Sequence, residues 1–149
     1  MNDLLTYTIT QEYLESLVPE REKELLDMEA YAEANDFPII GPVCGYYCYQ
    51  LARMIGARSV FELGSGFGYS TAWFAKAVSE TCSEQGQSDG GGVVHHTVWD
   101  ERLSGMARRY LAAMGIEHGG ALRTNNVRVR GGPVSHRQRS DRQPRARFR

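Results

Sequence analysis

Residues 60–71 read Val-Phe-Glu-Leu-Gly-Ser-Gly-Phe-Gly-Tyr-Ser-Thr, and this stretch decides the fold. The short run from Val60 to Leu63, apolar except for Glu62, predicts a strand of a parallel sheet that is buried on both faces. Glycines follow at alternate positions, and a helix-forming segment begins at Tyr69. Glycine tolerates positive φ and carries no Cβ, so this turn lets a small ligand approach the backbone closely. The stretch therefore predicts a strand, a ligand-binding turn and a helix N-terminus.

Two groups beside the glycines indicate what the turn could hold. Glu62 lies near the end of the strand, where a carboxylate can accept hydrogen bonds from an amine or a hydroxyl. The helix predicted over residues 69–79 buries Trp73 and Phe74 on one face. Its first turn offers free N–H groups and a positive dipole end, which suit a carboxylate or a phosphate.

A dinucleotide-binding turn is the main alternative interpretation, because its fingerprint is G-x-G-x-x-G after a strand. Here the third glycine comes one residue early, at Gly68, and Tyr69 stands where the fingerprint requires glycine. The acid two residues before the first glycine also differs from that fingerprint. An ordinary glycine-rich turn is the remaining alternative, and the combination of strand, acid and three alternate glycines argues against it.

The pattern E-x-G-x-G-x-G, from Glu62 to Gly68, resembles motif I of class I S-adenosylmethionine-dependent methyltransferases. The preceding sequence narrows the resemblance, because Phe37-Pro38-Ile39-Ile40-Gly41-Pro42 leads into an apolar segment over residues 43–55. The chain is similar here to the small-molecule O-methyltransferase family that includes the caffeoyl-CoA and catechol methyltransferases. That family has a P-I-x-x-P segment before a helix and the sequence G-Y-S-T after its cofactor loop, as in residues 68–71. The resemblance covers about residues 10–118 and is most specific over 56–75.

The resemblance implies an α/β fold, the N-terminal part of a Rossmann-like class I methyltransferase with its later strands missing. It implies S-adenosyl-L-methionine as cofactor and a hydroxyl group of a small molecule as methyl acceptor. The expected cofactor-binding residues of the first strand and its loop are Glu62, Gly64, Ser65, Gly66, Gly68, Tyr69 and Ser70. No catalytic residue can be named, and the residues with which the family holds a divalent cation are not present in this sequence.

A further cofactor ligand is expected after the second strand, because in this fold class an acid at that position binds the ribose hydroxyls. The apolar run over 93–99 predicts this strand, and Asp100 follows it directly. We expect Asp100 to be the ribose ligand, although the acid of the family would fall nearer Val98. The alternative is that Asp100 is the N-cap of the next helix, which is predicted over 104–114.

Helices are also predicted before the first strand. One spans residues 11–18, where Thr10 would be the N-cap and Pro19 the end, and a second spans 20–34. Pro42 can begin a third, over 43–55. The polar, Gly- and Ser-rich residues 81–92 predict a linker.

The sequence predicts one partial domain over residues 1–118, followed by a tail. Within the domain, helices occupy 10–55 and the cofactor-binding half occupies 56–118. Residues 119–149 contain nine arginines, no lysine and one acid, Asp141, and show no apolar periodicity, so we expect disorder. This change of composition favours a methyltransferase truncated or frameshifted after about residue 118. A basic arm that binds nucleic acid is the alternative, and the lack of lysine argues against it.

Composition restricts the remaining possibilities. The 149-residue chain has a formal net charge of −1, which does not indicate nucleic acid as a partner, and no apolar segment approaches the ~18 residues of a membrane span. Three cysteines, an odd number, favour a reducing cytoplasm. We expect a small-molecule partner and no membrane, and a homo-oligomer stays open.

Two functions follow from the sequence. The first is an S-adenosylmethionine-dependent O-methyltransferase by family, for which we expect weak cofactor binding and no turnover by this chain alone. The second is a non-catalytic protein, either a cofactor-binding remnant or a nucleic-acid binder with a basic tail.

Overall fold

The computed structural model of the chain describes residues 2–86, 92–116 and 122–124. In chain order its elements are α1 (Asn2–Ser16), α2 (Lys23–Ala34), α3 (Gly41–Met54), β1 (Ser59–Leu63), α4 (Tyr69–Glu84), β2 (Val93–Thr97), α5 (Glu101–Ala113) and β3 (Leu122–Thr124).

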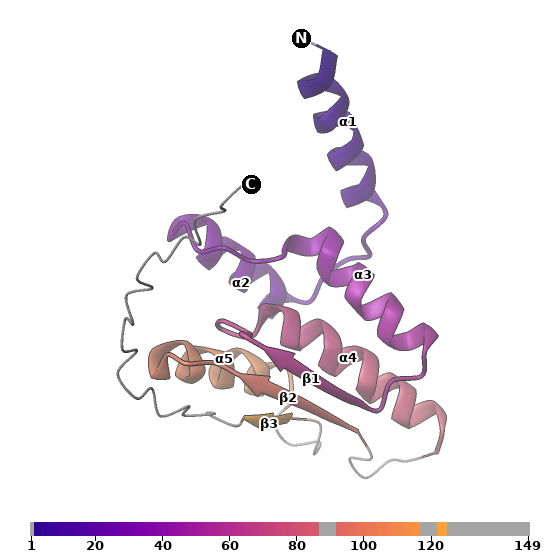
Figure 1. The fold of residues 1–149 in the computed structure, drawn as a ribbon, viewed down its shortest axis with the longest axis vertical. Helices are drawn as coiled ribbons and strands as arrows, with labels where there is room; N and C mark the ends of the chain where they lie inside the picture. The colour runs from indigo at the N-terminus through magenta and orange to yellow at the C-terminus, as the bar shows by residue number, and fades with distance from the viewer. Residues whose placement is uncertain (1, 87–91, 117–121, 125–149) are drawn as a thin grey trace, which may run out of the picture.

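The strands form a parallel sheet in the order β1-β2-β3, which is visible in Figure 1. Ser59 pairs with Val93 and Leu63 pairs with Thr97, so β1 and β2 end at the same edge. Parallel neighbours need a crossover connection, and α4 supplies the one between β1 and β2. The carboxyl ends of both strands, and the loops that follow them, are therefore brought together.

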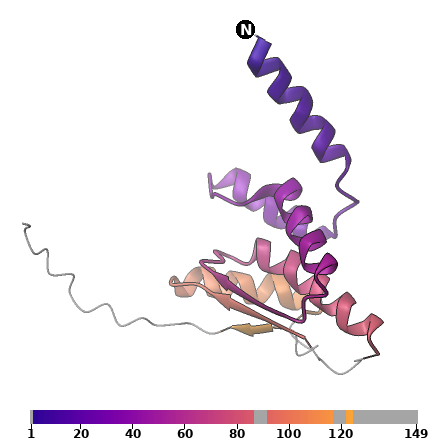
Figure 2. The same cartoon turned by 45° about the vertical axis from the view of Figure 1, so that its right-hand side comes forward.

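The helices build the core on one face of this sheet. α4 packs against β1 and β2, and α3 packs on the outer side of α4 (Figures 1 and 2). At the contact between α3 and α4, Gly45 allows a close approach, because a Cβ there would lie 2.3 Å from Trp73 Nε1. The larger core cluster joins α2, the glycine loop, α4 and α5, and its largest members are Leu25, Met28, Phe67, Tyr69, Trp73, Met106 and Leu111.

Strand β1 has two unlike faces. Val60 and Glu62 are half-buried and face the helices, whereas Phe61 is 58% exposed and Leu63 is 82% exposed. β1 is also an edge strand of the sheet among the described residues. The prediction of a strand buried on both faces is therefore wrong for this strand, because no described element covers its second face.

The first helix differs from the prediction. It begins at Asn2, not at Gln11, and Thr10 lies inside it, where the Thr10 hydroxyl donates a 2.8 Å hydrogen bond to the Thr6 carbonyl instead of capping. α1 projects away from the rest of the molecule in both ribbon views (Figures 1 and 2). Its side chains Tyr7 and Tyr13 are exposed. None of the helices in the described part of the chain combines the length and the hydropathy of a membrane span.

The other boundaries shift in ways that have local causes. α4 continues to Glu84, so the first residues of the predicted linker are helical, and Thr81 and Cys82 are buried there. α5 begins at Glu101, three residues earlier than predicted, because Asp100 caps it. β3 lies beyond residue 118, where the readable fold was expected to stop, so the expectation of two strands is corrected to three. The rest of the predicted tail lies outside the described residues.

Candidate functional site

The glycine loop between β1 and α4 has left-handed backbone at alternate residues. Gly64, Gly66 and Gly68 have φ values of 80°, 54° and 95°. L-residues with a Cβ rarely adopt these values, so the alternate glycines of the sequence are explained by the backbone path. A tight turn follows, in which the Gly68 N–H donates to the Ser65 carbonyl at 2.9 Å.

Thr97, the last residue of β2, fixes the start of this loop. Its carbonyl accepts from the Ser65 N–H at 2.9 Å, and its own N–H donates to Ser65 Oγ at 3.2 Å. The Thr97 hydroxyl donates to the Glu62 carbonyl at 2.6 Å and accepts from the Gly64 N–H at 3.3 Å. Ser65, expected to bind cofactor, therefore has its buried hydroxyl engaged within the protein. Sequence reasoning missed Thr97, whose only signal was its place at the end of the second strand.

Glu62 lies against the first turn of α4. One carboxylate oxygen accepts a hydrogen bond from the Ser70 hydroxyl, and the other accepts from the Thr71 hydroxyl at 2.5 Å. The N-cap residue of α4 is Gly68, which has no side chain to offer. Glu62 thus places a negative charge at the positive end of α4, which is a favourable position for a carboxylate. It also makes that end less attractive to an anion.

Behind Glu62 lies His96, which is 1% exposed. Its Nδ1 is 2.9 Å from the Thr71 hydroxyl oxygen. Burial lowers the pKa of His96 from its ordinary value of 6.5, against a raising effect of Glu62 and with a further lowering effect of Arg108. The ring is therefore neutral at neutral pH.

A cavity of about 420 Å³ opens beside the loop. One wall is the loop and the start of α4, and the other is the segment before α3, so its lining is Phe37, Pro38, Ile39, Ile40, Gly64, Ser65, Gly66, Phe67, Tyr69 and Ser70. The two motifs that carried the family resemblance, 37–42 and 62–71, thus face each other. Of the predicted site residues, Glu62, Gly68 and Asp100 lie outside this lining.

Two of the predicted cofactor-binding residues, Gly68 and Tyr69, have structural roles. A Cβ on Gly68 would stand 3.1 Å from the Cβ of Ala107, so this glycine allows α5 to pack closely on the loop. The buried Tyr69 donates from its hydroxyl to Glu29 at 2.6 Å, and Arg21 forms an ion pair with Glu29 at 2.9 Å. Burial, and then the bond to Glu29, raise the pKa of Tyr69. Tyr69 therefore ties α4 to α2 and is also one of the residues that line the cavity.

Asp100 is the N-cap of α5. Its Oδ1 accepts from the N–H groups of Arg102 at 2.7 Å and Leu103 at 3.1 Å. The N-cap alternative is therefore confirmed. Both bonds use Oδ1, so the capping role and a ligand role through Oδ2 are compatible.

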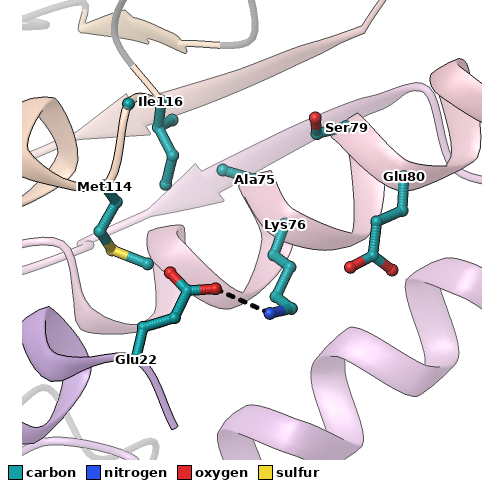
Figure 3. Close-up of a pocket in the computed structure, with 8 residues that line it drawn as sticks. Glu22, Ala75, Lys76, Ser79, Glu80, Met114 and Ile116 are labelled. Carbon is teal, nitrogen blue, oxygen red and sulfur yellow. Dashed lines mark hydrogen bonds and ion pairs between the residues drawn. The ribbon is translucent and has the colours of Figure 1, made fainter.

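Another cavity, of about 230 Å³, lies on a different side of α4 (Figure 3). Lys76 crosses it and forms a 2.8 Å ion pair with Glu22, while Met114 and Ile116 supply apolar wall. None of the residues of the glycine loop lines it. Within the described residues, no group of three His, Cys, Asp or Glu side chains is arranged to hold a metal ion.

No protein-family model matches this sequence, and no curated protein matches it significantly. Solved structures do match. A methyltransferase from Geobacter sulfurreducens is similar with a TM-score of 0.65 and 27% identity over 80% of this chain and 57% of that one. The chain has the N-terminal part of a methyltransferase fold.

Other structures with this fold are O-methyltransferases. The enzyme from Bacillus cereus, solved in complex with S-adenosylhomocysteine, matches with a TM-score of 0.63 and 24% identity over 80% of this chain and 50% of that one. TomG from Streptomyces achromogenes, in complex with S-adenosylmethionine, matches with a TM-score of 0.60 and 24% identity over 74% and 45%. The predicted methyltransferase fold is confirmed, and the predicted resemblance to O-methyltransferases agrees with these structural similarities.

The chain spans about half the length of these methyltransferases. For this chain, the activity of the whole enzymes is therefore a proposal.

Proposed function

We propose that the loop cavity binds S-adenosylmethionine and that the chain is the cofactor-binding part of an O-methyltransferase for a small-molecule hydroxyl. The observation that carries this proposal is that Glu62 accepts a hydrogen bond from Ser70, which lines the cavity, beside a glycine loop with left-handed backbone at Gly64 and Gly66. When bound, S-adenosylmethionine would supply an activated methyl group on its sulfonium.

The residues fit such a cofactor. Gly64 and Gly66 present bare backbone to the cavity, so the amino-acid end of a ligand can approach it closely. Each carboxylate oxygen of Glu62 accepts one hydroxyl and keeps a lone pair, which can accept from an ammonium group. Phe37, Ile39 and Ile40 give apolar wall for the uncharged parts of the ligand.

The same carboxylate argues against a dinucleotide. A pyrophosphate at a helix N-terminus relies on the positive dipole end and on free N–H groups. Glu62 brings a negative charge to that end of α4 and would repel a phosphate. The charge at this position therefore supports a ligand with a cationic end.

We propose Asp100 as the ribose ligand, through Oδ2, while Oδ1 continues to cap α5. We assign no base for the acceptor hydroxyl, because nothing in the described part of the chain is placed to take that role beside the cavity. We propose that methyl transfer needs the remaining part of the methyltransferase fold, which the match to this chain does not cover.

The test is calorimetric titration of the full chain with S-adenosylhomocysteine, using two matched glycine variants. Gly64 and Gly56 both have positive φ, 80° and 62°, and a Cβ on either would meet nothing within 4 Å. Alanine costs roughly 1–2 kcal/mol of backbone strain at each position. Only Gly64 borders the cavity, so Gly64→Ala should weaken binding by about tenfold or more and Gly56→Ala should not change it.

Either of two results would overturn the proposal. The first is a cooperatively folded wild-type chain that does not bind S-adenosylhomocysteine. The second is equal loss of binding in the two variants, which would trace the effect to strain alone.

A further inference from the structure

We infer that His96 is a positioning residue for the cofactor site, because it fixes the hydroxyl of Thr71 that in turn holds the Glu62 carboxylate. This inference rests on the proposed function of the loop cavity. Nothing in the sequence motif around Glu62 indicates it, since His96 lies on the next strand of the sheet.

The direction of the hydrogen bonds follows from the number of protons available. The Thr71 hydroxyl has one hydrogen, and the carboxylate of Glu62, 2.5 Å away, can only accept. The 2.9 Å contact between the Thr71 oxygen and His96 Nδ1 must therefore use the Nδ1–H of the ring as donor. The chain of donors runs from His96 to Thr71 to Glu62, and it specifies the Nδ1–H tautomer.

The surroundings of the ring keep it in that state. His96 is buried on the helix-facing side of β2, and its register partner on β1 is Glu62. Its Nε2 is buried and has no hydrogen-bond partner among the described residues. A proton on Nε2 would have no acceptor there, so the neutral ring with a donating Nδ1 is favoured.

The consequence for binding is selective. With His96 donating, the Thr71 hydroxyl cannot rotate toward the ring and remains directed at Glu62. Ser70 holds the second carboxylate oxygen, so the two hydroxyls together fix the plane of the carboxylate. Only the part of a ligand that contacts Glu62, its ammonium group, should be sensitive to the loss of His96.

Two substitutions separate the hydrogen bond from the buried volume. His96→Leu keeps an apolar side chain in the site but removes the donor. His96→Asn supplies an amide N–H close to where Nδ1 stood, so it should restore the bond to Thr71. Thr71→Val removes the hydroxyl that joins His96 to Glu62, and Thr71→Ser keeps it; neither variant changes the imidazole ring. This pair tests the link if His96→Leu does not fold.

The experiment titrates each folded variant with two probes, S-adenosylhomocysteine and methylthioadenosine. The second probe has the adenosine and thioether but lacks the ammonium and carboxylate. We expect His96→Leu and Thr71→Val to weaken S-adenosylhomocysteine by about tenfold and methylthioadenosine by less than about twofold. His96→Asn and Thr71→Ser should stay within about threefold of wild type for both probes.

The outcomes distinguish the inference from the proposed function. Equal weakening of both probes would mean that His96 only supports the fold, and unchanged binding of both would mean that the link to Glu62 has no effect; each overturns the inference alone. A folded wild-type chain that binds neither probe would overturn the proposed function, and the inference with it.

Discussion

The two faces of β1 differ in polarity and in solvent exposure. On the helix side, Glu62 is held by two hydroxyls of α4 and lies beside the buried His96. On the other side, Phe61 and Leu63 are 58% and 82% exposed. The same five-residue strand therefore carries a hydrogen-bonded carboxylate on one face and exposed apolar side chains on the other.

The two faces differ because, among the described residues, packed elements cover only one of them. The helix-facing side depends on α4 and β2, which the chain itself supplies. The exposed face and the free edge of β1 have no such partner among the described residues, and a free edge with apolar side chains tends to associate. We therefore expect the cofactor half-site to be well formed in a chain that is prone to self-association.

The largest expected effect comes from a matched pair of phenylalanines. Phe67 is 1% exposed and its ring contacts Tyr31, Phe37 and Tyr110. Phe67→Ala should lower the free energy of unfolding by about 3–5 kcal/mol, whereas Phe61→Ala should change it by less than about 1 kcal/mol. Chemical denaturation of both variants measures this, and comparable losses would show that Phe61 is packed in the folded chain as firmly as Phe67 of the glycine loop.

The next effect concerns the charge of Glu62. Glu62→Gln keeps the shape of the side chain but removes the charge that would attract an ammonium group. We expect the free energy of S-adenosylhomocysteine binding to weaken by about 1.5–3 kcal/mol. Glu84→Gln, at the distant end of α4, is the control and should leave the affinity unchanged. Calorimetry of both variants decides, and an unchanged affinity in Glu62→Gln would exclude a direct role of the carboxylate.

Part of this site could be predicted from the sequence, and part depends on contacts between residues far apart in the chain. The run 60–71 indicates a strand, a glycine turn and a helix because local conformational preferences determine all three. The roles of Thr97 and His96 could not be read in the same way, since they depend on which residues of β2 stand beside β1. The exposure of Phe61 and Leu63 was also missed, because an apolar run does not show whether a second layer covers it. β3 was missed because it is short and follows no apolar pattern.

A smaller effect is expected from pH. The pKa of His96 is lowered in the folded chain, chiefly by burial and also by Arg108, while Glu62 acts in the opposite direction. The unfolded chain therefore binds this proton more readily, so stability is fully present above the ordinary value of 6.5 and is lost as the pH falls below it. Chemical denaturation should be measured from about pH 7.5 to about pH 5, which spans about one unit or more on each side of that pKa. The free energy of unfolding should decline more steeply in wild type than in His96→Leu. Parallel declines would contradict a buried neutral His96.

The smallest effect on stability is expected on the exposed face. Leu63→Lys places a charge on the free edge of β1, at a side chain that contributes little to the core. The free energy of unfolding should stay within about 0.5 kcal/mol of wild type, while self-association at high protein concentration should decrease. Thermal melts with sedimentation velocity measure the two quantities together. A large loss of stability would indicate that Leu63 is packed in the folded chain.

Hydrogen exchange of the full chain, with and without S-adenosylhomocysteine, can locate the cofactor site on the molecule. The ligand should slow exchange of the backbone amides in 64–70 and of those of Phe37, Ile39 and Ile40, which belong to the two walls of the loop cavity. Residues around the second cavity, Lys76 to Glu80 and Met114 to Ile116, should be unaffected. Protection confined to that second cavity, or no protection in a chain that is folded, would contradict the assignment of the glycine loop as the cofactor site.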